Sequence, residues 1–235
     1  TGRPRAGIFR LRLMKVVREE GYMRHESMIV PEGLPFIVPL AVAVAVAFFY
    51  NAQILAAFLL LLLLFVLNFF RNPERIFSGE ERALLSPADG RVIRVDDKAS
   101  HELIDGSCRK ISIFMNVFNV HVNRAPCSGV IESIRYEKGE FLSADKDAAS
   151  EQNEKNALLI RTGEGRKIVT VQVAGLIARR IVCWLKEGME VRKGERFGMI
   201  RFGSRLDVFL PRDASVSVKI GDKVRAGETP IGYWP

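Results

Sequence analysis

The sequence predicts a mainly β domain, a flattened pseudo-symmetric β-barrel or sandwich, preceded by an N-terminal hydrophobic helical hairpin. Three observations lead to this prediction. Residues 34–70 carry no charge, residues 85–235 alternate short Val- and Ile-rich runs with turn residues, and one turn-rich pattern occurs twice. Short apolar runs interrupted by Gly, Pro, Asp and Asn are typical of all-β domains. At 235 residues the chain has room for one domain and an additional segment.

The uncharged segment divides into two arms, residues 34–50 and 54–70, around the polar residues Asn51 and Gln53. As a helix, each arm of about 17 residues is roughly 26 Å long, slightly less than the roughly 30 Å hydrocarbon core of a bilayer. Neither arm has a polar face, which disfavours the alternative of a buried hairpin in a soluble protein. We therefore expect a hairpin that crosses the bilayer or dips deeply into it.

The charges on either side of the hairpin predict its orientation. The formal net charge of the chain is +8, and Arg and Lys are frequent both in residues 1–33 and in residues 71–82. By the positive-inside rule both ends of the hairpin lie in the cytoplasm, at the inner face of the cell membrane. Anionic lipid is then a better partner for the basic arm than nucleic acid. For this arm, an amphipathic surface helix and a solvated tail both remain open.

Cysteine and histidine give no sign of a disulfide framework or a metal site. The three cysteines, Cys108, Cys127 and Cys183, form no CxxC pair, and their odd number suits a reducing compartment. The histidines are far apart in the sequence and show no ligand spacing. We therefore expect no metal.

The repeated pattern consists of residues 186–198, KEGMEVRKGERFG, and residues 219–232, KIGDKVRAGETPIG. Each copy predicts two tight turns around a valine, because glycine supplies the positive φ that such turns need. Similar repeats occur in lipoyl and biotinyl carrier modules, whose modified lysine lies at a hairpin tip. Residues 199–209 hold no lysine, so the carrier function is disfavoured, although the fold is not.

Four further segments together resemble one enzyme family. They are FRNPER at 70–75, LSPADGRV at 85–92, NVFNVHVNRAPCSG at 116–129 and FGSR at 202–205. In combination these motifs are similar to those of the phosphatidylserine decarboxylases, in their short membrane-associated form. The resemblance extends over roughly residues 28–235. It implies a proenzyme. With the charge and hydropathy patterns above, the chain then divides into a basic arm at 1–33, a membrane hairpin at 34–70 and a β catalytic domain at 71–235.

The resemblance implies that the chain cuts itself between Gly203 and Ser204, leaving a β chain, 1–203, and an α chain, 204–235. Attack by the serine hydroxyl on the preceding carbonyl gives an ester, and glycine leaves that carbonyl unshielded. Elimination and hydrolysis then convert Ser204 into a pyruvoyl group. This group replaces pyridoxal phosphate as the electron sink, because its carbonyl condenses with the substrate amine.

Activation of the serine requires a base and a group that orients the base. His121, in an apolar strand-like run, is the candidate base, and Asp89, in a Pro-x-Asp-Gly turn, is the candidate orienting group. The resemblance implies that these two residues and Ser204 form the catalytic triad. The sequence departs from the H-x-x-H of the longer branch of the family, since Arg124 stands three residues after His121. Arg124 and Arg205 are candidates for binding the substrate phosphate or carboxylate.

The expected reaction is decarboxylation of membrane phosphatidylserine to phosphatidylethanolamine, and the resemblance also suggests a homodimer. Two other functions compete with it. A membrane-tethered adaptor would remain uncut and would tolerate Ser204→Ala. A membrane-bound hydrolase would keep a free Ser204 hydroxyl that reacts with acylating inhibitors.

Overall fold

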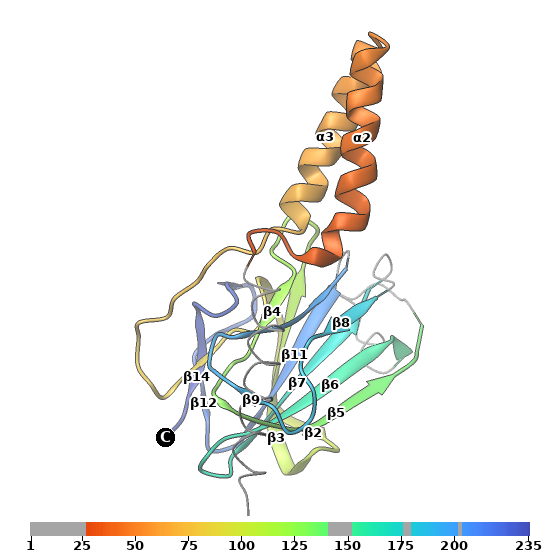
Figure 1. The fold of residues 1–235 in the computed structure, drawn as a ribbon. Helices are drawn as coiled ribbons and strands as arrows, with labels where there is room; N and C mark the ends of the chain where they lie inside the picture. The colour runs from red at the N-terminus through yellow and green to blue at the C-terminus, as the bar shows by residue number, and fades with distance from the viewer. Residues whose placement is uncertain (1–26, 141–151, 176–179, 202–203) are drawn as a thin grey trace, which may run out of the picture. The chain divides into compact units, whose positions relative to one another are not determined.

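The computed structural model describes residues 27–140, 152–175, 180–201 and 204–235. The basic arm, except for residues 27–33, and Gly203 of the predicted cleavage site lie outside these ranges. The described residues form two compact units that meet in sequence between Glu74 and Arg75. The first unit holds two helices and the second holds all the named strands (Figure 1). The predicted mainly β fold with two preceding helices is thereby confirmed.

In the first unit, a short 3-10 turn, Pro31–Gly33, leads into α2, Leu34–Phe49, and α3 follows at Gln53–Phe69. The two helices run side by side (Figure 1). They are apolar on all sides, so that large side chains such as Phe48 and Leu61 are 71% and 68% exposed. Within the described residues, Pro31–Phe49 is the helical stretch that is long and apolar enough to cross a membrane, and α3 is shorter.

In the described residues of the second unit there are fourteen strands. They are β1 (Ala83–Leu85), β2 (Gly90–His101), β3 (Ile104–Met115), β4 (Val122–Arg124), β5 (Gly129–Glu137), β6 (Lys155–Arg161), β7 (Lys167–Ala174), β8 (Ile181–Cys183), β9 (Glu190–Val191), β10 (Arg196–Ile200), β11 (Ser204–Pro211), β12 (Ser215–Val216), β13 (Lys223–Val224) and β14 (Pro230–Tyr233).

Eight of these strands form one curled sheet, a half-barrel, in the order β13-β2-β3-β11-β7-β6-β5-β9 (Figure 1). Neighbouring strands in this sheet are antiparallel. Two smaller sheets have the orders β1-β14-β12 and β4-β10-β8. β11 lies inside the large sheet, and Ser204 through Phe209 are paired on both sides, with β3 and with β7. The start of β11 is therefore held by two neighbouring strands.

The two copies of the repeat occupy equivalent places in the sheets. β9, from the first copy, forms one edge of the large sheet, and β13, from the second copy, forms the other edge. β10 and β14, the later strands of the two copies, are the central strands of the two small sheets. All four predicted turn glycines have positive φ: Gly188 (81°), Gly194 (79°), Gly221 (97°) and Gly227 (72°). The sequence pattern therefore correctly predicted the local turns.

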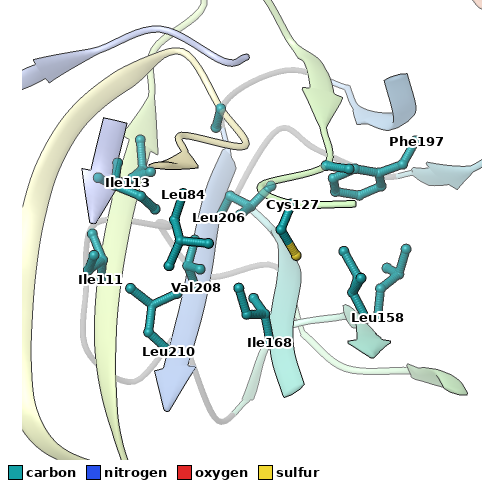
Figure 2. Close-up of a cluster of buried hydrophobic side chains, with 14 of the residues drawn as sticks. Leu84, Ile111, Ile113, Cys127, Leu158, Ile168, Phe197, Leu206, Val208 and Leu210 are labelled. Carbon is teal, nitrogen blue, oxygen red and sulfur yellow. The ribbon is translucent and has the colours of Figure 1, made fainter. Parts of the chain in front are cut away.

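The main hydrophobic core lies on one face of the large sheet. Because side chains alternate along a strand, Leu206, Val208 and Leu210 of β11 point into this core (Figure 2). Phe209 belongs to a second, smaller cluster on the opposite face. Ser204 has the same parity as Leu206, so its side chain is directed toward the face of the main core.

Candidate active site

Ser204 begins β11 and is fully buried. Its direct neighbours across the sheet are Met115 of β3 and Ala174 of β7. Its Oγ has no hydrogen-bond partner within the described part of the chain. Leaving a buried hydroxyl without a partner costs about 1–3 kcal/mol, so the position of Ser204 is energetically unfavourable in the uncut chain.

His121 lies just before β4, after the turn that follows β3, and it is fully buried. Its Nδ1 lies 3.0 Å from the carbonyl oxygen of Asn119. A carbonyl can only accept, so Nδ1 carries the proton in this contact. In the neutral ring Nε2 then holds the lone pair. This tautomer is the one that a general base needs if it acts through Nε2.

Asp89 is buried between two partners, and both lie in the same unit. Arg75 donates from Nη1 to Oδ1 at 2.5 Å and from Nη2 to Oδ2 at 2.9 Å, and the backbone N–H of Ala226 donates to Oδ1 at 2.8 Å. Burial lowers the pKa of Arg75, but hydrogen bonding and charge attraction from Asp89, with attraction from Glu228, outweigh it and leave the pKa above its ordinary value. Arg75 therefore remains charged and holds Asp89 in a bidentate ion pair.

The contact with Ala226 has a counterpart in the other copy of the repeat. There the backbone N–H of Lys193 donates to Oγ of Ser128 at 2.9 Å. A serine hydroxyl thus closes the same turn without a charge. Asp89 differs from Ser128 in its charge, which allows it to form an ion pair with Arg75 in addition to the bond that closes the turn.

Backbone pairing brings the predicted triad segments toward one another. The N–H of Arg124 donates to the carbonyl of Pro87 at 2.9 Å, and the N–H of Leu85 donates to that of Pro126 at 2.9 Å. The two segments are therefore antiparallel. Asp89, which follows Pro87, and His121, which precedes Arg124, lie toward the same end of the pairing. Within the described residues, however, Asp89 forms its hydrogen bonds with Arg75 and Ala226 and not with His121.

Comparisons with known proteins identify the family. The sequence matches the family described as phosphatidylserine decarboxylase over residues 62–232. A phosphatidylserine decarboxylase proenzyme of Syntrophus aciditrophicus is 54% identical over 89% of this chain and 99% of its own length. Those of Desulfotalea psychrophila and Geotalea uraniireducens are 50% and 49% identical, over 86% and 91% of this chain and 94% and 100% of their own lengths.

The chain belongs to the phosphatidylserine decarboxylase family. It is therefore a proenzyme of a pyruvoyl-dependent decarboxylase, which confirms the predicted enzyme class, cofactor and reaction. The residues at the start of β11 fit this cofactor. Ser204 Oγ is buried and makes no hydrogen bond in the described segments, so converting this residue into a ketone would break no contact seen there.

The two candidate arginines of the decarboxylase are both buried. Arg205 alternates with Ser204 along β11, so its side chain is directed toward the opposite face of the sheet. There its Nε lies 2.9 Å from Asp207, whose other oxygen is 2.9 Å from Nζ of Lys110. Arg124 donates from Nη1 to the carbonyl of Gly194 at 2.9 Å. A substrate-binding role for either arginine stays a prediction.

Sequence reasoning did not identify Arg75 as the ion-pair partner of Asp89. Arg75 is the last residue of the motif FRNPER, but the motif alone does not predict which acidic residue the arginine pairs with. Metal binding was not predicted, and in the part of the chain that the structure describes, no three His, Cys, Asp or Glu side chains lie close enough to hold an ion.

Proposed function

We propose that Ser204 is the residue that this decarboxylase converts into pyruvoyl, that His121 is the base in self-cleavage, and that Asp89 helps to orient it. The single observation that carries the proposal is the position of Ser204. It is a fully buried serine at the first residue of a strand paired on both sides, and its Oγ lacks a partner in the described segments.

In self-cleavage, His121 Nε2 takes the proton of Ser204 Oγ, and Oγ forms a bond to the carbonyl carbon that precedes it. The bond from that carbon to the Ser204 nitrogen breaks, and the nitrogen takes up a proton, giving an ester. Loss of the Ser204 α-proton then expels the carboxylate of the β chain. Hydrolysis of the dehydroalanine releases ammonia and leaves the new terminus of the α chain.

The pyruvoyl group supplies the electron sink for loss of CO₂. The chain supplies the surroundings. Ser204 and His121 are both fully buried, so the site excludes water and favours departure of the substrate carboxylate as neutral CO₂. His121 can deliver a proton from Nε2 to the product carbon, a step typically worth about 10²- to 10⁴-fold in rate.

The helical unit supports a membrane role. We propose that residues 34–70 insert into the membrane, with the basic arm at 1–33 on anionic headgroups and the catalytic domain at 71–235 on the cytoplasmic side. The apolar surfaces of α2 and α3 support this arrangement. The substrate then need not leave the bilayer fully. The homodimer stays a prediction.

We also propose that the catalytic domain is a pseudo-symmetric, lipoyl-like barrel or sandwich made of two related halves. Three equivalences support it: the edge positions of β9 and β13, the central positions of β10 and β14, and the four positive-φ glycines.

Intact-mass spectrometry of freshly synthesised full-length protein tests the proposal. The native chain should give fragments 1–203 and 204–235, the smaller with a pyruvoyl terminus, and Ser204→Ala should remain whole. His121→Ala should slow cleavage by about 10²-fold or more. Asp89→Asn is a matched probe, because its side-chain oxygen can still accept from Ala226. Rapid, complete cleavage of Ser204→Ala would refute the cleavage site, and the same result for both His121→Ala and Asp89→Asn would refute the triad.

A further inference from the structure

Three buried amide side chains form a line that ends beside Ser204. Asn156 of β6 donates from Nδ2 to Oε1 of Gln172 of β7 at 3.0 Å, and Gln172 donates from Nε2 to Oδ1 of Asn123 of β4 at 2.9 Å. Asn123 and Gln172 are fully buried, and Asn156 is 3% exposed. We refer to these three residues as the amide relay. None of them has a role in the self-cleavage described above.

The direction of the relay is fixed by a group that can only accept. Gln172 Nε2 also lies 3.4 Å from the carbonyl oxygen of Val182. Because that oxygen has no proton to give, the Gln172 nitrogen must face it, and Oε1 must face Asn156. The second proton of Nε2 then requires the oxygen of Asn123 as its acceptor. The Asn123 amide group is therefore turned so that its nitrogen points away from Gln172.

That nitrogen points toward the neighbourhood of Ser204. Asn123 Nδ2 lies 3.8 Å from Sδ of Met115, and Met115 is the direct partner of Ser204 in the β3–β11 register. Gln172 is the partner of Leu206, which makes it a diagonal neighbour of Ser204 on the same face. Direct partners in antiparallel sheets have Cβ atoms about 4.5–5.5 Å apart and diagonal ones about 7–8 Å. The relay thus lies within side-chain reach of Ser204.

The Asn123 amide is poorly satisfied in this position. A thioether sulfur is a weak acceptor, and within the described segments it is the one acceptor of this fully buried NH₂ group. Oγ of Ser204, the register partner of Met115, also lacks a partner in the described segments. A donor held in place and poorly satisfied in the uncut chain can stabilise negative charge that develops near Ser204.

We propose that the Asn123 Nδ2–H group donates a hydrogen bond to the oxyanion that forms beside Ser204 during self-cleavage, and that Gln172 and Asn156 set its direction. When Ser204 Oγ bonds to the carbonyl carbon before it, the π electron pair of that carbonyl moves onto its oxygen. A fixed donor stabilises this charge without having to reorganise. Asn123 is then a catalytic residue of the cleavage step, and Gln172 is a positioning residue. The inference rests on the proposed role of Ser204.

The test is a double-mutant cycle on the self-cleavage rate of full-length chains made by cell-free synthesis and followed by intact mass. Asn123→Ala removes the donor and should slow cleavage by about 10²- to 10³-fold. Gln172→Glu presents an acceptor to Asn123, which turns the amide and directs its oxygen toward Ser204, so that cleavage should slow by about 10²-fold. In the Asn123→Ala protein the same Gln172→Glu change should have less than about a threefold further effect, because no amide is left to turn.

Thr170→Val is the matched control. Thr170 is a fully buried residue of β7 two positions from Gln172, its Oγ1 has no partner in the described segments, and valine has nearly its shape. It should cleave at the native rate. Thermal unfolding of each variant in the Ser204→Ala background separates a change in stability from a change in rate.

Two results would overturn the inference while leaving the role of Ser204 intact. One is cleavage of Asn123→Ala within about threefold of the native rate. The other is a Gln172→Glu change that slows cleavage by the same factor in the native protein and in the Asn123→Ala protein. That result would mean that the two residues act independently. An uncut native chain would instead refute the proposed function itself.

Discussion

Replacing Arg75 by methionine removes the cation from a buried ion pair and keeps most of the side-chain length. In the native protein the side chains of Arg75 and Asp89 are only 7% and 11% exposed. Among the described residues, Arg75 supplies two of the three hydrogen bonds that Asp89 accepts, and it also donates to the carbonyl of Ala226 at 2.7 Å. The variant leaves Asp89 with the Ala226 N–H as its one remaining described donor.

Breaking a buried ion pair by removing one partner typically costs about 3–5 kcal/mol, since the remaining charge is left uncompensated. For a protein of this size each 1 kcal/mol lowers the Tm by about 2–4 °C. We therefore expect Arg75→Met to lower the Tm by about 6–20 °C. The measurement is thermal unfolding of the full chain in detergent, with Ser204→Ala in both proteins so that neither is cut.

Arg135→Met is the control for this prediction. Arg135 and Glu102 have a nitrogen–oxygen distance of 2.7 Å, but their side chains are 52% and 58% exposed. An exposed pair of this kind contributes about 0–1 kcal/mol. If Arg75→Met lowers the Tm no more than Arg135→Met does, the buried pair does not stabilise the turn that carries Asp89, and the reasoning is wrong.

Three further predictions concern the catalytic domain. Gly90→Ala should destabilise it by about 3 kcal/mol in urea unfolding, because a Cβ there would lie 2.1 Å from the backbone oxygen of Phe114; a loss below about 0.5 kcal/mol would contradict this. Burial lowers the pKa of His101, whose Nδ1 accepts from the Leu103 N–H at 3.2 Å. As the pH falls, His101 is therefore protonated in the unfolded chain before it is protonated in the folded protein, and stability should fall below about pH 6.5. A His101→Gln variant whose Tm falls as steeply with decreasing pH would show that His101 is not responsible. Burial raises the pKa of Cys127 to about 12 against a smaller opposing effect of Lys193, so its thiol should resist iodoacetamide at pH 8.5 until the protein unfolds, and stability should decline between about pH 9 and 12. Rapid labelling of Cys127 in the native protein would count against its burial.

Local features of this protein were predictable because a few neighbouring residues determine them. An uncharged run without a polar face gives the two helices, whose observed limits, Leu34–Phe49 and Gln53–Phe69, lie within one residue of the predicted arms. Glycines in the repeated pattern give turns with positive φ, since only glycine adopts that conformation without strain. The motif around Ser204, taken with the other three, indicates the family and hence the reaction.

The partners of the site residues depend on the order and register of the strands, and the sequence does not contain these locally. Arg205 stands next to Ser204 in the chain, yet the alternation of a strand sends its side chain to Asp207 on the other face. Asp89 is proposed to orient His121, and the fold adds two partners that the sequence did not indicate, the Arg75 side chain and the Ala226 backbone N–H.

The sequence by itself thus determined the helices, the turns and the chemistry expected of Ser204. Only the tertiary structure decided which buried groups surround that serine, including the amide relay drawn from β4, β6 and β7. The physical reason is range. Helical periodicity and turn conformation arise from interactions within a few residues, whereas a contact such as that between Gln172 and Asn123 exists only after distant strands have paired.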